Sequence, residues 1–282
     1  MLLLKTLSTL PFPAIYTISS IAAFVLFHLF RYRRNISYHN IRRSFPDKSK
    51  SEVLDIQKKA YRYLTDTFLE ICKEYSQSQE ELISRVKLEN FSEIKELIKN
   101  NHSVIFLSAH TAPTEWLAHA ASLYLGVPID PAYKPIHNKS VDKFIFAIRS
   151  RYNATPIPYK TMAKDIVQRK NVSRCIAILA DLEPRSRDQA VQVNFLNQQT
   201  RFFLGSERVA KISNMPVYFV AIKSTSRGHY TATAQLLSLN PKELNSEELI
   251  QKYAKCIEDV ILEKPEAWLW THKRWKENHK NQ

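Results

Sequence analysis

Hydrophobic and polar positions follow two patterns along this chain, one typical of helices and one typical of buried strands. From Ser51 to Tyr75 the apolar residues recur three and four positions apart, which predicts a long amphipathic helix. Ser49 and Glu52 form the pattern of a capping box at its start. A shorter helix is predicted over residues 79–85. The apolar stripe of the long helix should pack against a core.

Beyond Asn90, predicted helices alternate with short apolar runs. The expected strands cover residues 104–107, 131–133, 155–157, 175–180, 191–196, 217–223 and 229–237. The expected helices cover residues 92–99, 113–125, 140–152, 161–169, 206–212 and 247–262. The last two strands are joined by a short turn at Gly228, which predicts an antiparallel hairpin. The pattern as a whole predicts an α/β fold with a mixed sheet flanked by helices and ligands at the strand ends.

The N-terminal segment differs from this pattern. Residues 11–30 carry no charged side chain and could cross a bilayer at about 1.5 Å per residue, although prolines and short polar residues weaken the signal. The arginines within residues 31–34 should stay on the cytoplasmic side. We therefore predict a membrane anchor with a basic flank over residues 1–36 and an enzyme domain at the cytoplasmic face over residues 37–282. A shallow anchor that does not span is the alternative.

A candidate general base follows the strand predicted over residues 104–107. That strand runs into His110, and Glu115 lies five residues farther on. Pro113 separates the two, because it disfavours helical geometry before itself and suits the first position of a helix. The carboxylate could then orient the imidazole while the ring takes a proton from a hydroxyl.

Polar residues also follow two other predicted strands, at Lys134 and Asp181. Because strand ends in α/β folds meet at one crevice, we expect these residues to lie near His110. A second match to the histidine–acid spacing, His137 and Asp142, lacks a preceding apolar run and is interpreted as chance.

The helix predicted over residues 140–152 carries Arg149 and Arg151. A histidine, a carboxylate, an arginine and Asp181 would suffice for acyl transfer to a hydroxyl. Simpler interpretations stay open, since Asp181 could cap a loop and the arginines could lie on a solvated helix face.

Composition narrows the class of partner. The chain has 282 residues, 44% of them hydrophobic, which suits a globular core. Its formal charge of +14 indicates an anionic partner: nucleic acid, acidic lipid headgroups or an acidic carrier protein. Three scattered cysteines give neither a disulfide framework nor a zinc pattern. With three glycines, a glycine-rich phosphate loop is excluded.

Residues 268–276 place three of the four tryptophans among cations. Such a mixture suits a bilayer interface or an anionic headgroup, and the alternative is that the tryptophans fill the core. We expect this stretch to contribute to substrate binding through Trp270, His272, Lys273 and Arg274.

Taken in order, these motifs resemble one family over nearly the whole chain. They are Asn40-x-x-x-Ser44-Phe45-Pro46, His110-x-x-x-x-Glu115, Tyr133-Lys134-Pro135, Asp181-x-Glu183 and residues 268–276. The sequence is similar to the bacterial lipid A biosynthesis acyltransferases, the late enzymes that add a secondary acyl chain, such as the lauroyl and myristoyl acyltransferases. The resemblance implies a glycerolipid-acyltransferase-like fold at the inner membrane, an acyl carrier protein as donor and a lipid A precursor as acceptor. It implies no metal and no organic cofactor.

The resemblance also implies roles for individual residues. His110 and Glu115 fall at the catalytic dyad, and Arg149 and Asp181 are expected to join them. The residues expected to bind substrate are Lys134, Arg151, Glu183, Trp270, His272, Lys273 and Arg274.

The chain departs from the family at two places. Trp116 follows the acid of the dyad instead of preceding it, and the aromatic-glycine block is reduced to residues 194–197. These departures leave the acceptor and the acyl length open.

Two alternatives to a lipid A acceptor therefore stay open. One is an acyltransferase for another membrane lipid, a lysophospholipid or an aminolipid. The other is a non-catalytic, membrane-tethered binder of anionic lipid. No zinc-finger spacing or single-strand-binding aromatic pattern favours nucleic acid.

Overall fold

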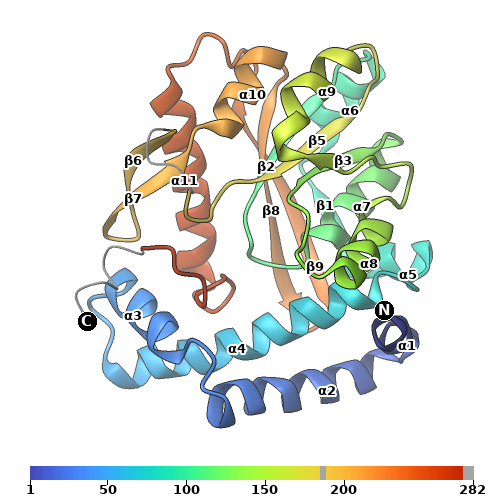
Figure 1. Cartoon of the computed structure of the whole chain (residues 1–282). Helices are drawn as coiled ribbons and strands as arrows, with labels where there is room; N and C mark the ends of the chain where they lie inside the picture. Colours follow the sequence, from blue (N-terminus) through green and yellow to red (C-terminus); the bar gives the residue numbers. More distant parts are fainter. Residues whose placement is uncertain (185–188, 276–282) are drawn as a thin grey trace.

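A seven-stranded mixed sheet forms the centre of the molecule. The computed structural model describes residues 1–184 and 189–275. The strands of the sheet are β1 (Val86–Glu89), β2 (Val104–Ser108), β3 (Ile129–Tyr133), β4 (Ile157–Pro158), β5 (Cys175–Leu179), β8 (Val217–Ser226) and β9 (His229–Ser238). Their spatial order is β1-β9-β8-β2-β5-β3-β4, and β8 and β9 pair as the expected antiparallel hairpin (Figure 1). The α/β fold with a mixed sheet is therefore confirmed.

Helices cover both faces of this sheet (Figure 1). Within the described residues they are α1 (Leu2–Thr9), α2 (Phe12–Phe24), the π-helix η1 (Val25–Leu29), α3 (Arg34–Ser44), α4 (Lys50–Lys73), α5 (Gln79–Arg85), α6 (Ser92–Lys99), α7 (Thr114–Leu125), α8 (Lys139–Arg149), the 3-10 helix η2 (Tyr159–Thr161), α9 (Met162–Gln168), α10 (Gly205–Ser213) and α11 (Ser246–Glu263). One core cluster lies on the side of α10 and α11, and a second lies on the side of α6 and α7.

The long helix α4 crosses the ends of the central strands, as Figure 1 shows. Ser49 forms the predicted capping box with Glu52, so the helix begins where the sequence indicates. Val53 and Tyr61 are buried on its core side, as expected from the apolar spacing. The helix α4 therefore covers the edge of the sheet at which β2 and β5 end.

Register brings two distant polar residues together. β2 and β5 are parallel neighbours, and Ser108 pairs with Leu179 at their ends. His110 and Asp181 each follow two residues later, so they leave the sheet side by side. β3 is the next strand along, which puts Lys134 at the same edge. The three strand-end residues thus gather as the pattern predicts.

Several elements were not predicted. The strand β1 and the helix α3 have short or polar sequences with weak periodicity. The run at residues 191–196 is one arm of a separate antiparallel pair, β6 (Ala190–Phe195) with β7 (Gln198–Phe203). Leu196 and Asn197 both have positive φ, at 50° and 60°, which is the geometry of a two-residue hairpin turn. The turn is hidden in the sequence because leucine rarely adopts this conformation.

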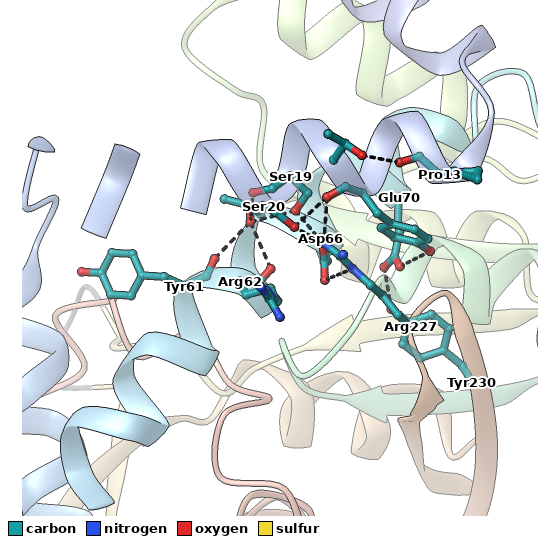
Figure 2. A network of polar contacts seen from close by, with 12 residues as sticks. Pro13, Ser19, Ser20, Tyr61, Arg62, Asp66, Glu70, Arg227 and Tyr230 are labelled. Carbon is teal, nitrogen blue, oxygen red and sulfur yellow. Dashed lines mark hydrogen bonds and ion pairs between the residues drawn. The ribbon is translucent and has the colours of Figure 1, made fainter. Parts of the chain in front are cut away.

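The apolar N-terminal helix lies along α4 and does not project away from the body (Figure 1). By length and composition Phe12–Leu29 could cross a membrane, with a mean hydropathy of 1.7 and 28% of the segment buried. Figure 2 shows polar contacts that hold it in place. The Ser19 hydroxyl donates to Asp66 at 2.5 Å, and the Tyr16 hydroxyl donates to Glu70 at 2.9 Å.

The turn between β8 and β9 closes this network, which we call the anchor network: Tyr16, Ser19, Asp66, Glu70, Arg227 and Tyr230. Arg227 donates to both oxygens of Asp66, at 2.9 and 2.6 Å, and to the Tyr16 carbonyl at 3.0 Å (Figure 2). The neighbouring Gly228 has φ +76°, and a Cβ there would lie 2.0 Å from the Tyr16 hydroxyl. Glycine is required at this point both for the turn and for the close approach.

Candidate active site

His110 and Asp181 form the central pair of the site. The Nδ1 atom of His110 lies 2.7 Å from Oδ1 of Asp181, and the backbone N–H of His110 donates to Oδ2 at 3.0 Å. Asp181 is fully buried, whereas 34% of the His110 side chain is exposed. The carboxylate therefore fixes the ring from behind while the opposite edge stays accessible.

A third donor completes the shell of Asp181. The indole N–H of Trp268 donates to Oδ2 at 2.9 Å. Burial alone would raise the pKa of Asp181, but the charge and hydrogen bonds of His110, with Trp268, lower it to about 2. The carboxylate is thus ionised and can only accept, so the proton of a neutral His110 ring lies on Nδ1 and Nε2 is its basic nitrogen.

The environment tunes the basicity of that nitrogen. Burial lowers the pKa of His110, but the charges of Asp181 and Glu115 outweigh this effect and raise it above its ordinary 6.5. Arg149 acts in the opposite sense. A histidine of this kind is a stronger base than a free imidazole, which suits the removal of a proton from a hydroxyl.

Glu115 has a different partner from the one expected. It sits in the first turn of α7, and Oε1 accepts from Arg149 Nε at 3.0 Å and from Nη2 at 2.7 Å. The expected hydrogen bond between Glu115 and the His110 ring is therefore corrected, because Asp181 occupies Nδ1. Burial raises the pKa of Glu115, but Arg149 more than compensates and holds it below its usual value. Glu115 orients the guanidinium instead.

A cavity of about 460 Å³ opens beside these groups. Its polar end is lined by His110, Glu115, Arg149 and Lys134, and its remaining wall is mainly apolar. The apolar lining includes Leu64, Ile71, Phe106, Ile129, Ala177 and Leu179. Alternate residues of β2 and β5 line it, as expected for the period of two in a strand, and β3 also contributes. The cavity combines one polar mouth with an apolar interior, which suits a fatty acyl chain.

The structure places Arg149 in this cavity with His110, as predicted, while Arg151 points elsewhere. Arg151 donates to the backbone carbonyls of Glu74 and Gln77, where it closes the end of α4. Its long side chain satisfies carbonyls that the helix leaves unpaired. These contacts give Arg151 a structural role, and its binding of substrate stays a prediction.

Three further expected contacts to substrate are also used internally. Arg274 is 1% exposed and donates to Glu183 at 2.9 Å, and burial, only partly offset by Glu183, lowers its pKa to about 10. Trp270 is 1% exposed and donates to the Pro265 carbonyl. The placement of Arg274, Glu183 and Trp270 favours the core-packing alternative for the tryptophans, and the substrate contacts of these residues stay predictions.

His272 lies close enough to interact electrostatically with His110 and Asp181. Burial and the charge of Arg274 lower its pKa to about 4, and its Nδ1 has no hydrogen-bond partner among the described residues. Lys273 is exposed. Both stay predicted substrate contacts, whereas Lys276 lies outside the described residues.

Sequence reasoning missed two supports of the site. Trp268 was noted as part of an aromatic cluster, but its bond to Asp181 had no local signal. The Tyr253 hydroxyl donates to the Ser108 carbonyl at 2.6 Å and accepts from the Ala180 N–H at 3.0 Å, so it ties the ends of β2 and β5 together. Over the described ranges, no group of three or more histidine, cysteine or acidic residues is arranged to hold a metal ion.

Comparison with known proteins identifies the family. Residues 1–277 match the model of the bacterial lipid A biosynthesis acyltransferases. The chain belongs to this family. Membership implies an acyltransferase activity, and it confirms the family resemblance that the motifs indicate. No curated protein matches the chain.

Proposed function

We propose that this lipid A family acyltransferase moves a fatty acyl chain from an acyl carrier protein thioester to a hydroxyl of a lipid A precursor. The observation that carries the proposal is the His110–Asp181 pair at the polar mouth of an apolar cavity. A base that is held from behind, with its free nitrogen at the mouth, suits the activation of a hydroxyl beside an acyl chain.

The reaction follows from this geometry. Nε2 of His110 takes the proton of the acceptor hydroxyl as its oxygen attacks the thioester carbonyl. Asp181 keeps the ring in the productive tautomer and stabilises the imidazolium that forms, the role of the aspartate in a serine–histidine–aspartate triad. The carbon–sulfur bond then breaks, and the imidazolium returns the proton to the departing thiolate. Ester and free thiol are the products.

Glu115 and Arg149 have a supporting role in this mechanism. Arg149 carries a guanidinium into the cavity and Glu115 holds it through two hydrogen bonds. A fixed cation at the mouth can stabilise the oxyanion that develops on the carbonyl or bind a phosphate of the acceptor. We assign Glu115 as the positioning residue for Arg149 and Asp181 as the one for His110.

An acyl carrier protein as donor is supported by charge. Carrier proteins of this class are acidic, and this chain has a formal charge of +14. Complementary charge speeds encounter more than it tightens the final complex. The apolar interior of the cavity would receive the acyl chain.

We also propose that the protein lies on the membrane with a shallow anchor. Exposed apolar side chains gather on the N-terminal helices, with Leu2 81%, Leu29 67% and Phe30 74% exposed. The opposite side of α2 is bound to α4 through the anchor network. A spanning orientation would break these buried polar contacts, whereas an in-plane helix keeps them and buries the apolar side chains in the bilayer.

Reconstitution tests the reaction. Purified protein, an acyl carrier protein loaded with a fatty acid and a tetra-acylated lipid A precursor should give a product heavier by one acyl chain. Mass spectrometry of lipids from cells with and without the protein would then identify the natural acceptor. Loss of an acyl group from a different lipid would keep the acyltransferase and discard the lipid A precursor.

Reporter fusions test the anchor. A phosphatase reporter that is active only outside the cytoplasm should be inactive when fused after residue 282 and also when fused before residue 1. A spanning helix would place the first reporter inside and the second outside. Activity of the N-terminal fusion alone would therefore contradict the shallow anchor.

A further inference from the structure

A second cavity lies at the junction between the anchor helices and the enzyme body. Its volume is about 550 Å³. The residues that line it come from the start of α3 and from one face of α4: Arg31, Arg33, Arg34, Asn35, Ile36, Tyr38, Leu54 and Gln57. We call it the junction cavity. None of these residues lines the cavity beside His110.

Among the described residues, no ion pair neutralises the positive charge in the junction cavity. No carboxylate of the described residues lies at ion-pair distance from the guanidinium groups of Arg31, Arg33 and Arg34. Arg33 donates to the Thr271 carbonyl at 3.2 Å, and Arg34 stacks over the Phe27 ring at 4.3 Å. Both contacts leave most guanidinium N–H groups available for another acceptor.

A buried acceptor belongs to a residue that lines the same cavity. Gln57 is 0% exposed, and its amide nitrogen donates to the Arg34 carbonyl at 2.6 Å and to the Ser37 hydroxyl at 2.7 Å. These two bonds fix which end of the amide is nitrogen. The remaining atom, Oε1, is buried and has no donor among the described residues. A buried acceptor without a donor is costly, so it indicates a ligand that brings an O–H or N–H group.

We propose that the junction cavity binds the headgroup of an anionic membrane lipid, a phosphate ester that also carries a hydroxyl or amine donor. The phosphate lies against the arginines at the start of α3, where no side chain caps the helix. The donor group reaches Oε1 of Gln57. Because the exposed Leu29 and Phe30 end the anchor just before Arg31, the cavity lies at the headgroup level of the bilayer in the shallow orientation.

One loop connects the region of the junction cavity with the active site. The loop that carries Trp268 onto Asp181 continues to Thr271, whose carbonyl accepts from Arg33. Asn40 of α3 donates to the carbonyls of Trp270 and His272, each at 2.9 Å. A headgroup held in this cavity would therefore lie one loop away from His110. The proposal rests on the proposed function in two respects, the shallow orientation of the anchor and the assignment of that headgroup to the acceptor.

A soluble headgroup tests the site without any catalysis. Full-length protein in a neutral detergent is titrated with glucosamine 1-phosphate, and binding is followed by the phosphorus NMR signal. Wild-type protein should bind. The double variant Arg33→Gln and Arg34→Gln, which removes charge, and Leu54→Trp, which fills the cavity but keeps the charge, should each bind at least about tenfold more weakly.

The matched control is the double variant Lys58→Gln and Lys59→Gln. These lysines are exposed on α4 next to Gln57 but do not line the junction cavity, so the same loss of charge should leave binding unchanged. Failure of wild-type protein to bind, or equal weakening in the control, would overturn the proposal. Retained binding in Leu54→Trp would do the same.

Two further measurements identify the source of the headgroup. If it belongs to the acceptor, the arginine variant should raise the KM for the lipid A precursor and leave kcat near the wild-type value. If it belongs to a resident phospholipid, KM in neutral detergent should not change. The arginine variant should then bind phosphatidylcholine vesicles that contain phosphatidylglycerol more weakly than the wild type does. Its binding to vesicles of phosphatidylcholine alone should match the wild type. Glucosamine 1-phosphate binding with no acyl transfer at all would refute the enzyme and keep the site.

Discussion

Two buried carboxyl groups, Asp181 in the active site and Glu70 in the anchor network, have pKa values shifted in opposite directions. In the active site, Asp181 accepts three hydrogen bonds and its pKa is lowered to about 2. In the anchor network, burial raises the pKa of Glu70 to about 7, although hydrogen bonds from Tyr230 and Tyr16 act against the rise. The first carboxylate is permanently ionised, and the second changes charge near neutral pH.

The partner of each carboxylate explains this difference. Asp181 faces a histidine that can carry a full positive charge, and that histidine opens onto a cavity. Glu70 faces two tyrosine hydroxyls within a closed interface between α2, α4 and the β8–β9 hairpin (Figure 2). Burial alone is therefore no sign of a catalytic carboxylate. An ionised partner with an open side is the better criterion.

The largest expected effect comes from removing the base. His110→Ala should lower kcat by about 10²–10⁴-fold, because no other group replaces Nε2. The anchor network is untouched, so membrane binding and thermal stability should stay near the wild-type values. His137→Ala is the control, since that histidine is exposed and lines neither cavity. Near-native turnover in purified His110→Ala would end the proposed mechanism.

Replacing the positioning carboxylate should be nearly as severe and should also move the pH profile. Wild-type activity is expected to rise with pH through the raised pKa of His110, because only the neutral ring is a base. Asp181→Asn should cost up to about 10⁴-fold in kcat, the cost of the matching change in a serine–histidine–aspartate triad. Without the charge that raises the pKa of His110, the rising limb should move to lower pH. An unshifted limb would assign the orienting role elsewhere, with Glu115→Gln as the comparison.

The residues in these two predictions show which parts of the site can be predicted from the sequence and which cannot. Strand ends at His110, Lys134 and Asp181 could be located from short apolar runs, since a buried parallel strand is a local pattern. The contact between His110 and Asp181 could not be predicted, because it depends on the register of β2 against β5, which are about seventy residues apart in the chain. Glu115 was assigned to the histidine by proximity in sequence. In space, the arginine on α8 is its partner.

In the N-terminal segment, too, the sequence predicts the element but not its contacts with distant parts of the chain. Its lack of charge predicted an anchor, but its disposition depends on partners far along the chain. Tyr16 and Ser19 were visible as polar positions within the apolar run. Their partners, Asp66 and Arg227, lie on elements that no local pattern connects to α2.

A third prediction concerns the pH dependence of the anchor network. The folded pKa of Glu70, about 7, exceeds its ordinary value of 4.5, so the folded state binds this proton more tightly. The group favours folding most below pH 4.5, and this contribution is lost as the pH rises through 7. The loss is on the order of 3 kcal/mol.

Glu70→Gln imitates the protonated carboxyl at every pH. Thermal unfolding of wild type and variant should therefore agree below pH 4.5, diverge as the pH rises from 4.5 to 7, and differ by a constant amount above pH 7, with the variant more stable. The difference between the two proteins removes the contributions of other titrating groups. Parallel curves across this range would show that Glu70 is ionised throughout.

The smallest expected effect is the loss of the ion pair at the hairpin turn. Arg227→Ala leaves Asp66 with the Ser19 hydroxyl as its main donor and should lower the free energy of unfolding by about 2 kcal/mol, less than for a fully buried pair because Arg227 is 35% exposed. Chemical denaturation measures this change in the free energy of unfolding. Lys223→Ala on the same hairpin removes an exposed ion pair with Glu263 and should change stability by less than about 1 kcal/mol. Specific activity of the folded fraction should not change in either variant.

The bond from Trp268 to Asp181 has a consequence for how the enzyme comes into being. A ribosome makes His110 and Asp181 well before it makes residue 268, so the sheet and both reacting residues can be in place while the chain is still being extended. The indole that completes the shell of the carboxylate is added 87 residues after Asp181. A chain that stops before residue 268 would hold the base without its finished support, so His110 and Asp181 would be present before the site is complete.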